Sequence, residues 1–237
     1  MASGFFAILD DIAALMDDVA MTSKLATKKT AGILGDDLAV NAEKATGFLS
    51  SRELPVLWAI TKGSFLNKLI ILPIIFGLNW LFPAAIKIIL VIGGLYLAYE
   101  GAEKIIEFFF HKKDHKTEHD EALDVMDDPI AAEKAKVKSA ITTDFILSLE
   151  IVIIALGSVL DQPLLNQILT VTVVSIIATV GVYGIVALIV RMDDAGYKLQ
   201  KKSKKEGGIL FNIGQLLINM LPWVIKILGV VGTIALI

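Results

Sequence analysis

The chain has 237 residues, of which 55% are hydrophobic and 20% are charged; it has no cysteine and a formal net charge of −3. Soluble domains are only about 45–50% apolar, so this composition, with a mean hydropathy of +0.71, favours a membrane protein. The missing cysteines exclude disulfides and thiol chemistry. The acidic balance argues against a nucleic-acid partner.

Residues 1–62 are predicted to form amphipathic helices at the cytoplasmic side of a membrane. In a first helix over 4–21, four carboxylates share one stripe because they recur at i, i+1, i+7 and i+8: Asp10, Asp11, Asp17 and Asp18. Anionic lipid would repel this stripe, so we expect it to dock on protein or to line a polar cavity. Carboxylates also suit a divalent cation, although nearby lysines offer salt bridges instead.

Long apolar runs then predict membrane helices, since about 20 apolar residues span a bilayer. We expect a first hairpin over 63–110 that turns near Pro83, and a second over 141–191 that turns at residues 161–163. A C-terminal span, 208–237, should break near Pro222. The chain stops inside apolar sequence, so we expect a further C-terminal segment.

The loops between these runs hold most of the basic residues. Loop 111–140 has six lysines, loop 192–207 also carries a basic cluster, and the two turns have no Lys or Arg. Positive charge marks the cytoplasmic side, which places segments 22–62, 111–140 and 191–206 in the cytoplasm. The predicted fold class is therefore all-α, a polytopic helical membrane protein.

The two hairpins also resemble each other. A shift of 80 residues places Phe65 on Phe145, Gly77 on Gly157 and Pro83 on Pro163. Apolar sequences match by chance, so both duplication and coincidence stay open. A true duplication would give parallel repeats, with a binding site expected at the repeat interface.

Several long motifs are similar to the YedI-like family of bacterial inner-membrane proteins: LDDIAALMDDVA (9–20), KTAGILGDDLAVNAEK (29–44), SRELPVLWAITKGSFLNK (51–68), GGLYLAYEGAEK (93–104) and TDFILSLEIVIIALG (143–157). The resemblance implies a bacterial inner (cytoplasmic) membrane and several membrane helices. It implies no substrate and no catalytic residues. Some members carry the DNA-repair label MutK, which this acidic, apolar chain gives no reason to adopt. Members of the family tend to run longer than this chain.

Glu150 is the main candidate functional residue, because it lies in an apolar run about 12 residues, or roughly 18 Å, from the turn. Intramembrane carboxylates usually face the bundle interior or a polar path. We expect Glu150, with neighbouring Ser148, to meet hydroxyls of the next helix. The predicted ion or proton path is Glu150, Ser148, Thr172, Ser175 and Thr179. The alternative is a glutamate that only fixes helix packing.

Two further groups are weaker candidates. Lys68 and Glu100 lie level across the first hairpin, which predicts a membrane ion pair. His111, His115 and His119 recur at i, i+4 and i+8, a spacing that can hold a metal ion. A solvated charge run is the alternative for the histidines.

We therefore expect a transporter-like protein for a small ion or a proton-coupled solute. The alternative is a non-transporting structural or assembly protein, and no enzyme motif is present. Expected partners are the lipid bilayer and further copies of the chain, with no nucleic acid. No cofactor is expected, although a divalent cation fits the carboxylates.

Overall fold

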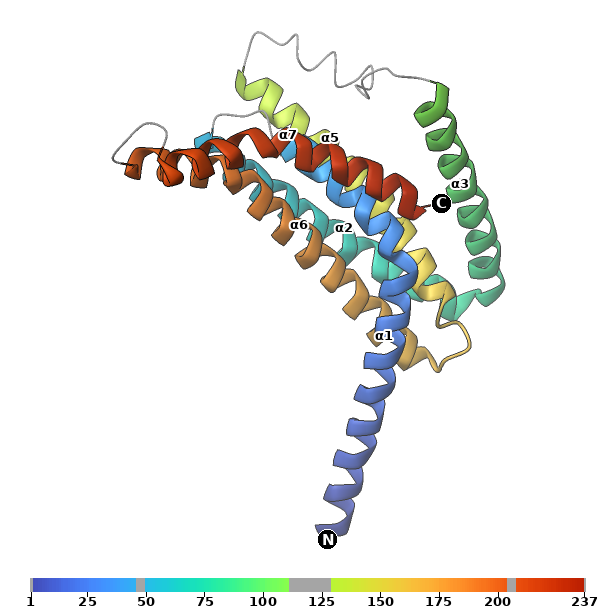
Figure 1. Ribbon diagram of the computed structural model, residues 1–237. Helices are drawn as coiled ribbons and strands as arrows, with labels where there is room; N and C mark the ends of the chain where they lie inside the picture. The colour runs from blue at the N-terminus through green and yellow to red at the C-terminus, as the bar shows by residue number, and fades with distance from the viewer. Residues whose placement is uncertain (1, 46–49, 111–128, 204–207, 237) are drawn as a thin grey trace.

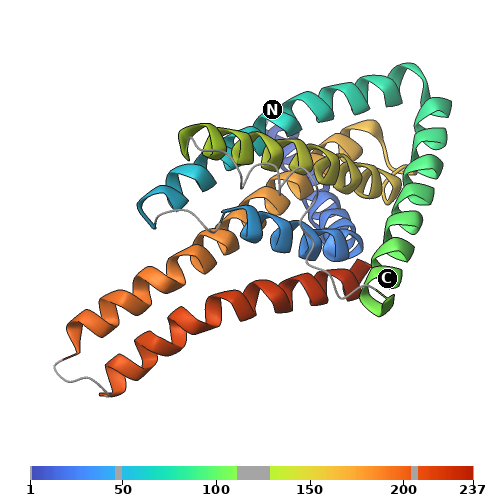
Figure 2. The same ribbon diagram turned by 90° about the horizontal axis from the view of Figure 1, so that it is seen from above.

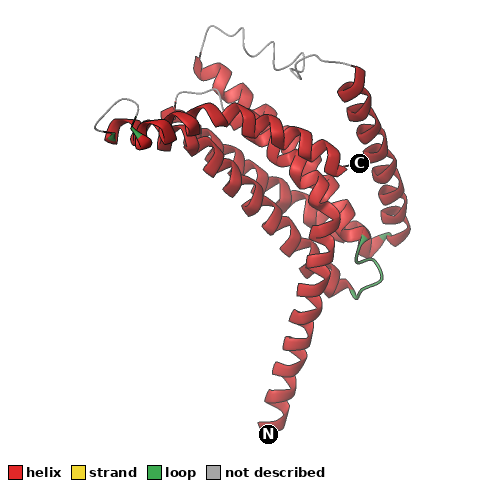
Figure 3. Cartoon of the chain, viewed as in Figure 1, coloured by secondary structure: helices red, strands yellow, loops and turns green. Residues whose placement is uncertain are grey.

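The computed structural model describes residues 2–45, 50–110, 129–203 and 208–236. These ranges are helical apart from two short turns and the ends of the connection after α6, and they contain no strand (Figures 1 and 3). The helices are α1 (Ala2–Ala45), α2 (Ser50–Leu81), α3 (Pro83–Phe110), α5 (Pro129–Gly157), α6 (Leu164–Lys202) and α7 (Ile209–Leu236). The all-α prediction is confirmed for the part of the chain that the structure describes.

Three of these helices are long and apolar enough to cross a membrane: Arg52–Leu81, Ile130–Gly157 and Leu164–Lys202. Their outer faces expose large apolar side chains, such as Leu69 at 70% and Leu188 at 71%. The interior, in contrast, contains charged and amide side chains. Large exposed apolar surfaces mark contact with a partner or a membrane, and this distribution fits a protein embedded in lipid.

Both predicted hairpin turns are present. Phe82 separates α2 from α3, and residues 158–163 form the turn between α5 and α6. The helices extend further than the sequence suggested. The boundary predicted between residues 62 and 63 falls inside α2, which begins at Ser50 and contains Pro55. The loop predicted over 111–140 contains the start of α5 at Pro129. Similarly, α6 continues to Lys202, past the predicted limit at 191.

The largest difference from the sequence prediction is in α1. Residues 2–45 form one helix, not an amphipathic helix over 4–21 followed by mixed polar sequence. Its first half projects away from the bundle (Figure 1), and the four aspartates of the acidic stripe are exposed there. Its second half is packed against α5, α6 and α7. The polar side chains of this half suggested a loop, but several of them face partners inside the bundle.

The second half of α1 extends along the bundle from one end to the other. Thr22 is hydrogen-bonded to Thr170, near the 158–163 turn, whereas Lys44 donates to Ser139, near the start of α5. We call these the turn end and the loop end. A segment 22–62 that lies wholly at the loop end does not fit this placement, because Thr22 is at the turn end.

The C-terminal helix is continuous. α7 runs from Ile209 to Leu236 through position 222, so the break expected at Pro222 is not found. α7 lies beside α6 (Figure 2) and also contacts α1. At the crossing with α6, a Cβ on Gly196 would lie 2.6 Å from the carbonyl oxygen of Gly214. Glycine at both positions therefore permits the close approach of the two backbones.

Helices α2 and α5 pack side by side and parallel. Arg52 is paired with Glu133, Ser64 with Asp144, and Lys68 with Ser148. The last two pairs are each 80 residues apart, the same offset that aligns the two hairpins in the sequence. Positions that the 80-residue shift aligns thus face each other, and a duplication with parallel copies would give this arrangement.

Candidate functional site

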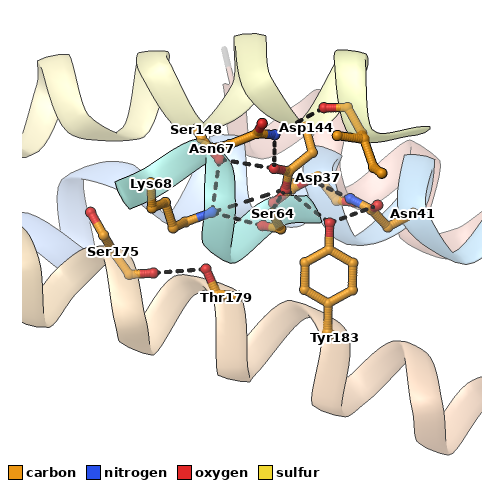
Figure 4. Close-up of polar contacts among 11 residues, drawn as sticks. Asp37, Asn41, Ser64, Asn67, Lys68, Asp144, Ser148, Ser175, Thr179 and Tyr183 are labelled. Carbon is orange, nitrogen blue, oxygen red and sulfur yellow. Dashed lines mark hydrogen bonds and ion pairs between the residues drawn. The ribbon is translucent and has the colours of Figure 1, made fainter. Parts of the chain in front are cut away.

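A group of polar side chains lies buried where α1, α2, α5 and α6 meet (Figure 4). We call it the four-helix polar cluster. Its members are Asp37, Asn41, Ser64, Asn67, Lys68, Asp144, Ser148 and Tyr183, each less than a tenth exposed. A buried charge is costly unless it is paired and hydrogen-bonded, so the contacts of the charged members decide what the cluster can do.

The carboxylate of Asp144 is the centre of the cluster and is 1% exposed. Its Oδ1 accepts hydrogen bonds from Ser64 Oγ at 2.8 Å and from the Tyr183 hydroxyl at 2.9 Å. Its Oδ2 accepts from Asn67 Nδ2 at 2.9 Å and from Ser148 Oγ at 3.3 Å. An ionised carboxylate only accepts, and all four partners can donate.

The Lys68 ammonium lies next to this carboxylate. Its Nζ is 4.0 Å from Asp144 Oδ1, and it donates to Ser64 Oγ at 2.9 Å and to Ser148 Oγ at 2.8 Å. The two serines therefore connect the ammonium to the carboxylate as well as separating their charges. This arrangement stabilises both ions while leaving them short of full contact.

Asp37 supplies a second carboxylate, from α1, which is not among the three helices apolar enough to span a membrane. Asn41 Nδ2 donates to it, and Asn41 Oδ1 lies 3.2 Å from the Tyr183 hydroxyl. Burial, reinforced by the charge of Asp144, raises the pKa of Asp37 from 3.8 to about 7, although Lys68 opposes the shift. Asp37 therefore gains or loses a proton near neutral pH.

Helical spacing explains why these residues meet. Asp37 and Asn41, Ser64 and Lys68, and Asp144 and Ser148 are each four residues apart, and side chains at i and i+4 lie on the same helix face. Each of α1, α2 and α5 thus contributes one short polar patch to the cluster. The parallel register of α2 and α5 brings two of these patches together.

Three of the five predicted path residues lie in or beside the cluster. Ser148 belongs to it, and Ser175 and Thr179 of α6 are buried, at 1% and 2% exposure, and appear in the same view as the cluster (Figure 4). Thr172 is only half-buried. Ser175 and Thr179 are therefore buried side chains of α6, and their role in an ion or proton path stays a prediction.

Glu150 is buried, at 6% exposure, but on another side of α5. Six residues separate it from Asp144, which places the two carboxylates about 120° apart around the helix. Glu150 lines a pocket of about 270 Å³ with Tyr96 of α3 and with Thr143 and Leu147 of its own helix. Thr143 and Glu150 are seven residues apart and share a face of α5, and that face is directed toward Tyr96 of α3.

The structure does not bring together the predicted ion pair or the predicted metal ligands. The described partners of Lys68 are Ser64, Ser148 and Asp144, and the side chain of Glu100 lies outside the described part. Among the described residues, no three His, Asp or Glu side chains come close enough to hold a metal ion. The three histidines lie in 111–128, also outside the described residues.

Sequence reasoning missed Asp37 and Asp144 as site residues. Asp144 stands at the edge of an apolar run, where a charge is ordinary, and Asp37 lies in sequence that looked solvated. One signal was available. The 80-residue shift places Asp144 on Ser64 and Ser148 on Lys68, so polar residues coincide at both aligned positions.

Comparison with known proteins gives a family and no function. No curated protein and no solved structure matches the chain. A family model described as "Protein of unknown function (DUF808)" matches residues 3–237. This family match does not confirm the narrower YedI-like name or the MutK label. Since the family match covers nearly the whole sequence, the chain belongs to the DUF808 family of proteins of unknown function.

Proposed function

We propose that this protein is a proton-coupled membrane transporter for a small ion, with the four-helix polar cluster as its exchange site. The observation that carries the proposal is the Lys68 ammonium, 4.0 Å from Asp144 and 5% exposed among helices that are apolar on their outer faces. Ionisable residues inside membrane helices are costly and usually mark ion or proton pathways.

The charges of the cluster suit an exchange. With Asp37, Asp144 and Lys68 all ionised, the three groups sum to −1, and one proton on Asp37 makes them neutral. A cation could take the place of that proton, because carboxylate, amide and hydroxyl oxygens are ligands for hard cations. Lys68 competes with any such cation for Asp144. A proton and a cation would therefore bind in alternation, which is the requirement for coupling.

Proteoliposomes containing a trapped pH-sensitive dye test the proposal directly. Gradients of Na⁺, K⁺ and Mg²⁺ are applied one at a time, and proton movement is followed. We expect one of these gradients to drive proton movement in the wild type, and Asp144→Asn and Asp37→Asn to reduce it by at least about tenfold, the effect of about 1.4 kcal/mol on a barrier. Asn79→Ala, a substitution of a polar residue outside the cluster, should transport normally.

Two outcomes contradict the proposal: no gradient moves protons in the wild type, or both cluster variants transport at the wild-type rate. Asp37→Asn keeps the shape of the side chain and resembles its protonated form. It therefore remains informative if Asp144→Asn does not fold.

A structural role is the second candidate, and one observation favours it: hydrogen bonds of the cluster connect all four helices. In this case Asp144→Asn would weaken the bundle, and the folded wild type would move no protons. Thermal unfolding measured beside the flux separates the two roles.

A further inference from the structure

One face of α6 is exposed along most of the helix. Exposed residues recur on it at spacings of three and four residues, which keep side chains on one side of a helix: Ile177, Gly181, Gly184, Leu188, Arg191, Ala195, Lys198 and Lys202. We call these eight residues the α6 stripe. The opposite face of α6 is packed inside the bundle, where Val182, Val186 and Val190 are buried. The α6 stripe is therefore one continuous outer surface of the protein.

The α6 stripe changes its chemical character at one point. It has no charged residue up to Leu188, which is 71% exposed, and its next member is Arg191. Exposed apolar surface suits acyl chains, whereas Arg and Lys side chains extend into the headgroup region. Leu164 and Leu188 are 24 residues apart, roughly 36 Å along a helix, which matches a hydrocarbon core of about 30 Å for a tilted helix. The edge of the hydrocarbon core therefore lies between Leu188 and Arg191.

Tryptophans of α2 support this placement, because Trp collects at the two surfaces of a membrane. Trp58 is 61% exposed, and the next residue toward the N-terminus, Leu57, belongs to the same buried cluster as Val186 of α6. Trp58 therefore lies near the level at which the α6 stripe becomes basic. At the turn end, Trp80 is 71% exposed and marks the opposite surface.

The basic part of the α6 stripe has an excess of positive charge. Residues 191–203 contain four basic and two acidic residues. Arg191 is paired with Asp194 at 2.9 Å, but an exposed pair is weak and a guanidinium has further N–H groups that can donate. Lys198 and Lys202 are exposed and have no ion pair or hydrogen bond among the described residues. These cations are therefore able to bind an anion.

Helix geometry directs the cations toward the membrane. Side chains of an α-helix lean toward its N-terminus, and the N-terminus of α6 is at the turn end. Lys198 and Lys202 therefore lean back along the α6 stripe toward Arg191. The residue between Arg191 and Lys198 on the stripe is Ala195, whose small side chain leaves space between the two cations for a phosphate group.

The apolar part of the α6 stripe is open next to these cations. A Cβ built on Gly181 or on Gly184 would have no atom of the described residues within 4 Å. The two glycines keep the outer side of the helix flat between Ile177 and Leu188, so an extended acyl chain can lie against it.

We propose that the α6 stripe binds an anionic phospholipid, with an acyl chain against Gly181, Gly184 and Leu188 and the phosphate at Arg191 and Lys198. Charge complementarity selects this occupant, because anionic headgroups attract Lys and Arg at a membrane surface. An apolar helix from another chain would leave the cations unused. No member of the stripe belongs to the four-helix polar cluster, so this inference is independent of the proposed transport function.

Native mass spectrometry of the full chain, released from detergent, tests the assignment. The probes are phosphatidylglycerol and phosphatidylcholine with identical acyl chains, so that only the headgroups differ. We expect the wild type to bind phosphatidylglycerol at least about tenfold more tightly than phosphatidylcholine, because several cations attract the anionic headgroup. Equal affinities for the two lipids would overturn the proposal.

A pair of double variants locates the site. Lys198→Gln with Lys202→Gln removes two exposed lysines four residues apart. Lys24→Gln with Lys28→Gln is the matched control, since these lysines of α1 are also exposed and four residues apart but lie near the turn end. We expect the first double variant to lose at least about fivefold of the preference for phosphatidylglycerol and the control to keep it. An equal loss in both, or no loss in either, would overturn the location.

The same spectra report whether a second copy covers the α6 stripe instead. In that case the wild type would be a dimer, Gly184→Leu would dissociate it, and the substitutions at 198 and 202 would leave the lipid preference unchanged. This combination would assign the surface to a protein interface and would overturn the lipid site.

Discussion

Asp144 and Lys68 depend on each other, because each is the nearest opposite charge of the other inside the bundle. Removing one partner of a buried pair leaves the other charge uncompensated and typically costs about 3–5 kcal/mol. Removing both leaves neither charge of the pair without its partner. The serines and the amide around them can still satisfy one another, so the two substitutions should not be additive.

A double-mutant cycle tests this dependence. We expect Lys68→Met and Asp144→Asn each to lower the free energy of unfolding, and the double variant to lose less than the sum by about 1–3 kcal/mol. Denaturant unfolding in detergent measures all four proteins. Additive losses would show that the two charges do not interact.

Asp37 gives the stability of the protein a predicted pH dependence. Its pKa is about 7 in the folded protein against an ordinary value of 3.8 for a solvated aspartate, so the folded state binds the extra proton between these values. The contribution of Asp37 to stability is therefore greatest below pH 3.8 and falls as the pH rises toward about 7. The charges of Asp144 and Asp36 face Asp37 and raise its pKa, and the charge of Lys68 lowers it.

Melting temperatures of the wild type and Asp37→Asn, measured across this range, isolate the contribution. We expect the wild type to lose stability as the pH rises toward 7, relative to Asp37→Asn. Parallel curves would contradict a raised pKa.

The residues of the site were only partly predictable. Ser148, Ser175 and Thr179 could be identified because hydroxyls in an apolar run stand out. Asp37 could not, because the charges that face it inside the bundle, Lys68 of α2 and Asp144 of α5, are distant in sequence, and no local pattern encodes that placement. Glu150 stands out more clearly in sequence than Asp144, yet its pocket is on the side of α5 toward α3.

At the scale of the element, hydrophobic runs and prolines predict helices well where the run faces lipid or core. Both hairpin turns follow from Phe82-Pro83 and from residues 161–163. α1 shows the limit of this reasoning. Its second half is too polar to be recognised as an interior helix, because side chains that appear solvated are paired inside the bundle. Asn41 donates to Asp37 of the same helix and accepts from the Tyr183 hydroxyl of α6.

The crossing of α6 and α7 depends on two glycines. A Cβ at Gly196 would meet the Gly214 carbonyl oxygen at 2.6 Å, and a Cβ at Gly214 would meet the Gly196 carbonyl oxygen at 2.5 Å. Backbone atoms cannot move aside as flexible side chains can. We expect Gly196→Ala to separate the two helices and to lower the melting temperature.

Gly184→Ala is the matched control, since the same helix leaves open space at that position. Alanine is favoured over glycine in a helix by up to about 1 kcal/mol, so this variant should be as stable as the wild type or more so. A melting temperature of Gly196→Ala equal to that of Gly184→Ala would contradict the close crossing.

At the scale of the whole molecule, the parallel pairing of α2 and α5 creates the site. The offset of 80 residues between paired positions brings Ser64 and Lys68 against Asp144 and Ser148. The sequence showed the same offset as a weak similarity of the two hairpins. The sequence could not show that α2 and α5 pack against each other, because the pattern of apolar residues does not specify which helices are in contact.

A carboxylate that exchanges protons inside a lipid-embedded bundle is observed most directly by infrared difference spectroscopy. Spectra of the protein in lipid are recorded between about pH 5 and about pH 9, a range that spans the altered pKa of Asp37. We predict a carboxylic acid band that disappears as the pH rises through about 7 and that is absent from Asp37→Asn. A band unchanged by that substitution, or no band at all, would contradict a proton exchange at Asp37.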